Sequence, residues 1–451
     1  MNLSSRHSLL RAAVLGACLS ASSLVSLPAQ NLYWAPPSGN AWSTSAVNWS
    51  ATSGGIATFA WPSGGSVTEI AHFDGAGGGI SLDQDLSAGG IRFGEDGYIL
   101  SASAARVLTF TGASPEVNVG SGDTATLGTN IQILSTSKQF VKTGAGLLEL
   151  TSALSFFGTG STVANGSQLT VQEGTFRVAP GGNLNNGFTV VSVNTGASLL
   201  LDANVSIGGL SGSGNVSRNV AGAGYLLIRG AGSDFSGVIS GNIYLDKLNG
   251  TGVQTLSGNA SNTFTGTTNV RVGTLVLAKQ NGAIAISGSE VILGGGVTHQ
   301  LRLDGNEQMA DTTALTFRAD NNASSTFNLN GHSETLGALT ANDLGLGGTG
   351  LNQIDFGLNS TAQVLQFSSL SITSGGRIDI LNFDETLDSL RFLADPTSQL
   401  ARLFLNGETA YAFDQGSYWS VTTTIPEPGT ISLLGLVGIS LAALRLRRRK
   451  G

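Results

Sequence analysis

Short alternations of apolar and polar residues, separated by glycine, asparagine and serine, dominate the chain between residues 31 and 424. Residues 168–171 (Gln-Leu-Thr-Val) and 175–178 (Thr-Phe-Arg-Val) show the pattern, with Glu173 and Gly174 between them. An alternation over four residues with a glycine break is typical of a half-buried strand and its turn. Long apolar runs with a 3.6-residue period do not occur here. The pattern therefore predicts an all-β body of short strands.

Two stretches of this body repeat each other, at about 142–178 and 247–277. Aligning Gly174 with Gly273 places Val171 over Val270, an offset of 99 residues. The heads of the two copies read Lys-Thr-Gly-Ala-Gly at 142–146 and Lys-Leu-Asn-Gly-Thr-Gly at 247–252. Repetition at a fixed period with length changes confined to loops indicates stacked structural units.

These residues resemble the autotransporter-associated β-strand repeat, which runs Lys-Thr-Gly-x-Gly, an apolar alternation, Asn-Thr-aromatic-x-Gly-x-Thr and Gly-Thr-Leu. The second copy matches the loop at residues 262–268 and the ending at 273–275, but Asn249 is inserted near its head. The resemblance implies a right-handed parallel β-helix, or solenoid. Separate β-sandwich domains are the alternative, since they also use short strands with frequent turns. The lack of a Gly/Pro linker favours one continuous solenoid.

We expect the body to comprise residues 30–130 with an aromatic cap, 131–345 with the two repeats, and 346–424 with a second cap. Four of the five tryptophans, Trp34, Trp42, Trp49 and Trp61, lie near the start. They are interpreted either as a plug over the first coil or as a platform that contacts a glycan. At the other end, Ile378 to Phe392 is expected to form a hairpin-like cap near Trp419.

The N-terminal residues 1–29 have the features of a secretory signal peptide. Arg6 and Arg11 precede an apolar run, and Ala29 is the expected cleavage position. The one cysteine, Cys18, follows Leu-Gly-Ala as in a bacterial lipobox, but the apolar stretch after Arg11 is too short for that reading. Loss of Cys18 with the signal leaves the mature chain without a thiol or a disulfide.

The C-terminal residues 425–451 contain three successive parts. Pro426, Glu427 and Pro428 form a short extended motif, because proline disfavours helix in the residue before it. The apolar segment from Ile431 to Leu444 would be about 21 Å long as a helix, shorter than the ~30 Å hydrocarbon core of a bilayer. A basic tail follows, comprising Arg445, Arg447, Arg448, Arg449 and Lys450. Such a tail stays on the cytoplasmic side and leaves the body outside.

This order of parts resembles the PEP-CTERM sorting signal of Gram-negative bacteria that produce extracellular matrix. The resemblance implies cleavage near Pro426-Glu427-Pro428 by exosortase, a membrane transpeptidase-like enzyme, and release to the cell surface. The alternative is an ordinary tail-anchor helix, which the short apolar segment and the paired prolines disfavour. The general secretion machinery, exosortase and, for a time, the inner membrane are therefore the expected partners, with a surface polysaccharide as a further candidate.

Composition and charge exclude several classes of function. Only 11% of the residues are charged, against roughly 25% in an average soluble protein. The net charge is −7, and residues 30–424 alone carry 15 basic and 28 acidic side chains, a net charge of −13. A body this acidic disfavours binding of nucleic acid, which needs clustered Lys and Arg. Its 41% hydrophobic content also argues against a disordered chain.

Candidate residues for catalysis or metal binding are few. The three histidines of the body, His72, His299 and His332, fit no metal motif and are interpreted as surface or turn residues. Clustered carboxylates are expected in solvated turns, without a calcium-loop pattern: Asp83, Asp85, Glu95, Asp96, Asp384, Glu385 and Asp388. We therefore expect no catalytic site, metal or cofactor.

The functional prediction is an exported structural or adhesive protein of the cell surface or extracellular matrix, without enzymatic activity. A carbohydrate-binding or polysaccharide-degrading β-helix is the alternative.

Overall fold

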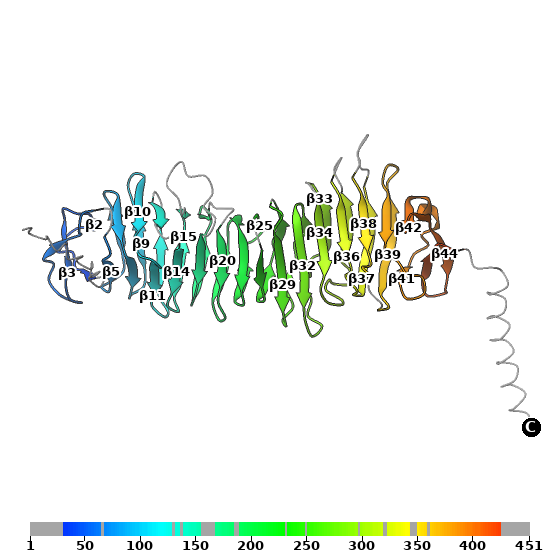
Figure 1. Ribbon diagram of the computed structural model, residues 1–451. Helices are drawn as coiled ribbons and strands as arrows, with labels where there is room; N and C mark the ends of the chain where they lie inside the picture. Colours follow the sequence, from blue (N-terminus) through cyan, green and yellow to red (C-terminus); the bar gives the residue numbers. More distant parts are fainter. Residues whose placement is uncertain are drawn as a thin grey trace, which may run out of the picture.

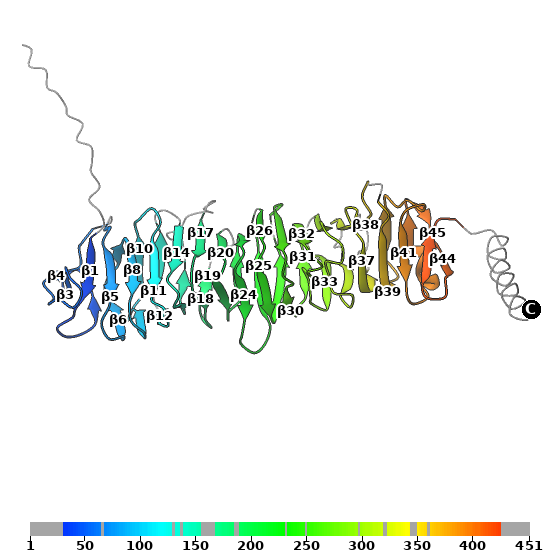
Figure 2. The same ribbon diagram turned by 90° about the horizontal axis from the view of Figure 1, so that it is seen from below.

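In the computed structural model the chain forms an elongated rod of β-strands, with the two ends of the body at opposite tips (Figure 1). The residues described by the structure are 30–64, 67–128, 131–135, 139–154, 167–184, 189–230, 232–248, 250–295, 298–318, 323–342, 350–358 and 361–424. Figure 2 shows the same succession of strands from a perpendicular direction.

One face of the rod is a sheet that runs almost its whole length, here called sheet A. In this sheet each strand pairs in parallel with the strand of the next coil. Its parallel strands are β1 (Asn31–Trp34), β5 (Ile70–Phe73), β8 (Gly90–Phe93), β11 (Glu116–Val119), β14 (Gln139–Thr143), β17 (Gln168–Val171), β20 (Val190–Val193), β23 (Gly209–Gly212), β26 (Ser233–Phe235), β29 (Val253–Gly258), β32 (Gly273–Lys279), β34 (His299–Leu303), β36 (Ser325–Asn328), β38 (Asn352–Asp355), β40 (Ile378–Leu381) and β42 (Leu403–Leu405). The ladder crosses both of the expected body boundaries, at 130 and at 345.

The second face, sheet B, covers the first two thirds of the rod. Its strands are β2 (Ala41–Trp42), β6 (Gly79–Leu82), β9 (Tyr98–Ser101), β12 (Thr124–Leu127), β15 (Leu147–Leu150), β18 (Thr175–Val178), β21 (Ser198–Leu201), β24 (Asn215–Arg218), β27 (Val238–Gly241) and β30 (Thr263–Phe264).

The third face consists of two sheets in succession, sheet C and then sheet D. Sheet C contains β7 (Leu86–Ala88), β10 (Arg106–Phe110), β13 (Ile131–Ser135), β16 (Ala153–Leu154) and β19 (Asn183–Leu184). Sheet D begins beside β19 and contains β22 (Val205–Ile207), β25 (Gly224–Ile228), β28 (Ile243–Lys247), β31 (Thr268–Val270), β33 (Glu290–Gly294), β35 (Ala314–Arg318), β37 (Glu334–Ala341), β39 (Val364–Ile372), β41 (Ser389–Phe392), β45 (Trp419–Thr422) and β44 (Tyr411–Asp414).

Alternating side chains build the core because every second residue of a strand points into the rod. In sheet B, Leu148, Phe176 and Leu199 lie opposite one another in three successive coils, and all three are fully buried. Parallel pairing between coils confirms the parallel β-helix and contradicts the β-sandwich alternative, whose sheets are antiparallel.

Antiparallel strands close the two ends of the rod. At the N-terminal end, β3 (Val47–Ser50) pairs with β1, and β4 (Phe59–Ala60) pairs with β3. At the C-terminal end, β43 (Glu408–Thr409) folds back on β42, while β45 lies between β41 and β44. The 3₁₀-helix η1 (Thr397–Arg402) precedes β42.

The expected hairpin from Ile378 to Phe392 is wrong. Strand β40 belongs to sheet A and pairs in parallel with β38 and β42, while β41 belongs to sheet D and pairs in parallel with β39. The segment is therefore a regular coil, and the cap lies farther along, where Trp419 pairs with Phe392. Strand alternation alone does not distinguish a hairpin from two faces of one coil, because both put alternate residues inside.

Both repeat heads fold into the same kind of corner, in which a buried lysine binds backbone carbonyls of two successive coils. The Nζ of Lys142 donates to the carbonyls of Thr143 at 2.8 Å, Gly144 at 2.7 Å and, in the next coil, Glu173 at 3.2 Å. Burial lowers the pKa of Lys142 to about 8, although Glu173 opposes this shift.

The second copy reproduces this lysine corner. The Nζ of Lys247 donates to the carbonyls of Gly250 at 3.4 Å and, in the next coil, Val272 at 3.2 Å. Glu173 and Val272 each precede a glycine, Gly174 or Gly273, with a positive φ of 63° or 77°. A Cβ at Gly174 would lie 2.4 Å from the carbonyl oxygen of Gly146 in the coil before it, so glycine is required there.

The two copies occupy different faces of the rod. Lys142 lies in sheet A and its corner leads into sheet B, whereas Lys247 lies in sheet D and its corner leads into sheet A. Consequently Val171 is in sheet A, while Val270, its counterpart in the alignment, is in sheet D. Each copy spans one full coil and the first strand of the next, and the two copies start at different corners, so the repeat is not tied to one face.

Replacing the corner lysine should destabilise the rod. We expect Lys142→Met to lower the free energy of unfolding by about 1–3 kcal/mol, because buried carbonyls lose their donor. Urea titration followed by circular dichroism measures this loss. Arg318→Met, on an exposed arginine, is the control and should leave the midpoint nearly unchanged. An unaltered midpoint for Lys142→Met would contradict a structural role for the corner.

Candidate functional site

The tryptophan cluster forms the interior of the N-terminal end. The rings of Trp42, Trp49 and Trp61 are at most 1% exposed, and Trp34 packs against them half-buried. Ring centroids are 4.5 Å apart for Trp49 and Trp61, 5.0 Å for Trp42 and Trp61, and 5.1 Å for Trp34 and Trp49. Phe73 of the next coil lies beneath them, 5.5 Å from Trp42.

This packing contradicts the glycan-platform interpretation for Trp42, Trp49 and Trp61. A sugar stacks on an aromatic ring only where a ring face is open to solvent, and these rings are covered by one another and by Phe73. They act as the plug that replaces the missing coil, since the first full coil otherwise exposes its apolar interior. Trp34 shares in the plug through its edge-on contact with Trp49.

Two of the three body histidines differ from the expectation of surface or turn positions. His299 is 1% exposed and its Nε2 lies 2.6 Å from the Oγ of Ser325 in the next coil. His72 is 7% exposed on β5, and burial lowers its pKa. His332 lies in the turn before β37. Across the described ranges, no group of three or more His, Cys, Asp or Glu residues could hold a metal ion.

Two of the four clustered carboxylates near the N-terminal end bind backbone amides at corners. Asp85 accepts a hydrogen bond from the amide of Val107 at 2.9 Å, and Asp96 accepts one from Thr124 at 2.7 Å. Asp83 accepts from the hydroxyl of Ser81 at 3.2 Å. Asp83 and Asp85 lie between β6 and β7, so they share a corner rather than the face of a strand.

The carboxylates of residues 384–388 are likewise used within the protein. Asp384 Oδ1 accepts from the amide and the hydroxyl of Thr386, and Asp388 Oδ2 accepts from the amide of Asp384 at 2.9 Å. Glu385 Oε1 accepts from the hydroxyl of Thr422 at 2.9 Å and from the amide of Thr423. Through Glu385, the turn at residues 384–388 therefore binds the C-terminal end of β45.

Glu334 is a buried acid that the sequence pattern did not single out. It is 0% exposed, and its two oxygens accept from the amides of Gln308 at 2.8 Å and Met309 at 3.0 Å in the preceding coil. Burial raises its pKa to about 8, although both amides pull in the opposite direction. A raised pKa is typical of catalytic acids, but such an acid must reach its substrate. Glu334 is enclosed, and it links two coils.

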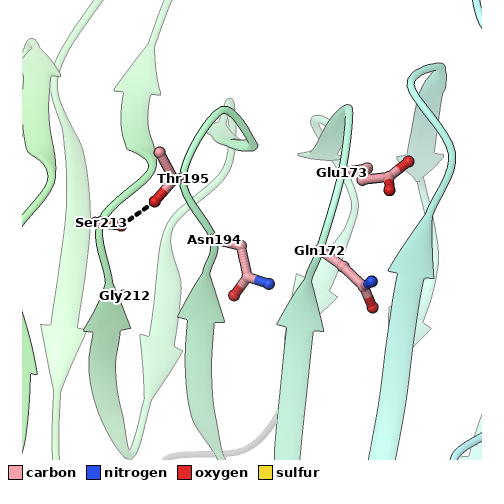
Figure 3. A pocket seen from close by; sticks show the side chains of 6 residues that line it. All are labelled: Gln172, Glu173, Asn194, Thr195, Gly212 and Ser213. Carbon is pink, nitrogen blue, oxygen red and sulfur yellow. Dashed lines mark hydrogen bonds between the residues drawn. The ribbon is translucent and has the colours of Figure 1, made fainter.

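A shallow depression of about 470 Å³ lies along one edge, where sheet A turns into sheet B. Gln172, Glu173, Asn194, Thr195, Gly212 and Ser213 line it (Figure 3). The hydroxyls of Thr195 and Ser213 form a hydrogen bond at 2.6 Å. The other side chains drawn in Figure 3 form no hydrogen bond with one another. The lining pairs no nucleophile with a base, so it has the chemistry of a polar surface rather than of a reaction centre.

The expected sorting and targeting residues lie outside the described part of the chain. Pro426, Glu427 and Pro428, the apolar segment from Ile431 to Leu444, and the basic tail follow residue 424. The expected signal cleavage at Ala29 lies before residue 30. Among the described residues, no helix has the length and apolar character needed to cross a membrane.

Residues 424–450 match the model of the PEP-CTERM protein-sorting motif. The chain is also 32% identical over 133 residues to an adhesin, the BmaC autotransporter of Brucella suis biovar 1 (strain 1330). That match covers 29% of this chain and 4% of the adhesin, so this chain spans a small fraction of the length of its curated relative. No solved structure matches the chain. The chain thus carries a PEP-CTERM sorting motif and is similar to an autotransporter adhesin in part of its length.

The burial of the plug tryptophans predicts that removing one of these rings lowers stability strongly. Trp49→Ala should lower the free energy of unfolding by about 3–5 kcal/mol, the usual cost of deleting a buried aromatic ring. Thermal unfolding followed by circular dichroism measures it. Trp34→Ala, at a half-buried ring of the same cluster, is the matched control and should cost clearly less. If both substitutions lower the free energy of unfolding by the same small amount, these rings do not stabilise the N-terminal end of the rod.

The raised pKa of Glu334 predicts that the free energy of unfolding depends on pH. Because its pKa is raised from 4.5 to about 8 on folding, the folded state holds a proton that the unfolded state lacks between these values. Its contribution to stability is therefore full below pH 4.5 and lost as the pH rises through 8, at up to about 1.4 kcal/mol per pH unit.

Urea titrations between pH 5 and pH 8 should show this decline, and Glu334→Gln should remove that part of the slope. Glu408→Gln, on an exposed carboxyl, is the control and should keep it. The same slope in Glu334→Gln as in the unaltered protein would assign the dependence to other groups.

Proposed function

We propose that this protein is a structural or adhesive rod of the bacterial cell surface or extracellular matrix, and that exosortase processes it at Pro426-Glu427-Pro428. The observation that carries the proposal is the PEP-CTERM sorting motif at 424–450, directly after a β-solenoid. The partial similarity to an adhesin favours a role in attachment over a purely mechanical one.

In the proposed route, the general secretion machinery exports the chain and the signal peptide is removed after Ala29. The apolar segment from Ile431 to Leu444 then holds the protein in the inner membrane for a time. At about 21 Å as a helix it is a weak anchor for a ~30 Å core, which suits a transient stage. The basic tail keeps the far end on the cytoplasmic side.

The junction between rod and motif supports this route. Glu385 holds Thr422 and Thr423, so the folded body extends almost to the motif. Two residues lie between Thr423 and Pro426, so the three steps along the chain span at most about 10 Å when extended. Cleavage at Pro426-Glu427-Pro428 would therefore remove only residues that follow the C-terminal cap and would leave the parallel coils intact.

We also propose that the protein has no enzymatic activity. The carboxylates of Asp83, Asp85 and Asp96 and those at residues 384–388 bind backbone or neighbouring groups, and the raised-pKa acid Glu334 is enclosed. The polysaccharide-degrading alternative needs two accessible carboxyls about 5–9.5 Å apart across a groove, and the depression of Figure 3 has Glu173 alone in its lining.

Substituting the motif tests the route. Wild-type protein recovered from the cell surface should yield no peptide beyond the Pro-Glu-Pro region in mass spectrometry. Alanine at Pro426, Glu427 and Pro428 together should leave full-length protein in the membrane fraction. Pro180→Ala, at an exposed proline of the body, is the control and should be processed normally. Recovery of an intact 445–451 segment in the mature surface protein would refute processing at the motif.

A further inference from the structure

The outer side of sheet A near its N-terminal end carries a row of chemically different side chains. Tyr33 of β1 lies opposite His72 of β5, His72 lies opposite Arg92 of β8, and Arg92 lies opposite Asn118 of β11. These four strands follow one another at the blue to cyan end of the rod in Figure 2. The row is at the tip opposite the C-terminal cap.

A depression of about 140 Å³ interrupts the sheet surface beside this row. Gly90 provides its floor, and Ile70, Arg92 and Glu116 are among the residues around it. A Cβ at Gly90 would lie 2.9 Å from the carbonyl oxygen of Glu116, so the backbones of two coils approach closely there. A larger residue at position 90 would fill the hollow.

The two charged groups at this depression are held differently. The carboxylate of Glu116 accepts a hydrogen bond from the hydroxyl of Thr143, and this hydroxyl accepts one from the side-chain amide Nδ2 of Asn118 at 3.0 Å. Arg92 is exposed and pairs with no carboxylate in the described part of the chain. Arg177, on sheet B, instead contacts both Glu149 and Asp202 at 2.7 Å. A fixed acceptor thus lies near a donor that is available for a ligand.

An aromatic surface adjoins the charged pair. The rings of Tyr33 and His72 have centroids 4.6 Å apart, and His72 Nε2 lies 3.1 Å from Asn31 Oδ1. Burial, the largest influence, lowers the pKa of His72, and Arg92 contributes in the same direction against Asp74. The imidazole is therefore a neutral ring at pH 7, and Tyr33 remains half-exposed beside it.

We propose that this face of sheet A binds a neutral hexose unit of a polysaccharide. Sugar hydroxyls both donate and accept hydrogen bonds, so they match a guanidinium donor next to a carboxylate acceptor. The apolar C–H face of a pyranose ring packs on an aromatic ring, which Tyr33 provides.

The ligand class follows from charge. Residues 30–68 contain no charged side chain, Glu116 lines the depression, and the body as a whole carries −13. An acidic polysaccharide would be repelled by this field, whereas a neutral one is not affected by it. The inference rests on the surface location proposed above, to which it adds a ligand and a site.

Binding of purified full-length protein to an array of neutral hexose oligosaccharides tests the site, with polygalacturonate as the anionic probe. We expect binding to at least one neutral oligosaccharide, and none to polygalacturonate. Arg92→Met and Tyr33→Ala should each weaken binding about tenfold or more, since each loses a contact to the sugar. Thermal unfolding of Arg92→Met should match that of the wild type, which separates lost binding from lost folding.

Matched controls are Arg318→Met and Tyr225→Ala, at an exposed arginine and an exposed tyrosine on sheet D. Both should bind within about twofold of the wild type. Absence of binding to every neutral oligosaccharide, equal binding by the Arg92 variant, or preference for polygalacturonate would each overturn the proposal. Because the assay uses isolated protein, its failure would leave processing at the sorting motif to be judged by its own experiment.

Discussion

Each coil of the rod depends on its two neighbours, because its strands find their backbone hydrogen-bond partners in the coils before and after it. The constraint extends to the corners, where carbonyls have no strand to pair with. Lys142, Lys247 and Lys279 donate to such carbonyls from buried positions. It also explains the ends. With no further coil available, β3 and β4 at one tip and β44 and β45 at the other pair antiparallel, and the tryptophans cover the open interior.

Because the coils stack in this way, the interior of the rod is filled by packing residues, and groups that could bind a ligand lie on its outer faces. Inward positions are taken by apolar ladders, and several interior polar groups, such as Glu334 and His299, serve as links between coils. Ligand-binding groups must therefore be assembled on the outer faces, one residue from each coil. The proposed site of Tyr33, Arg92 and Glu116 is an example, with members separated by 59 and 24 positions along the chain. Such a site leaves no linear motif, so the sequence pattern does not mark it.

Several expectations from the sequence failed for a common reason. The alternation around Ile378 to Phe392 was correct, yet its two strands lie in different sheets. His72 and His299 were expected at the surface, because their burial depends on neighbours from other coils. The sequence is compatible with both a plug and a glycan platform at the tryptophans, and only the mutual packing of Trp42, Trp49 and Trp61 identifies the plug. In each instance the deciding contacts join residues distant in sequence.

By itself, the sequence determined the local elements and the sorting signal. Period-2 alternation set which residues of a strand face inward, the repeated lysine and glycine positions set the corner, and the C-terminal residues carry the PEP-CTERM sorting motif at 424–450. Only the tertiary structure decided on which face each repeat lies, so that Lys142 turns from sheet A into sheet B and Lys247 from sheet D into sheet A. The physical reason is that alternation is a property of a single strand. The face that a strand joins depends instead on the lengths of all preceding corners and on register with the coil already formed.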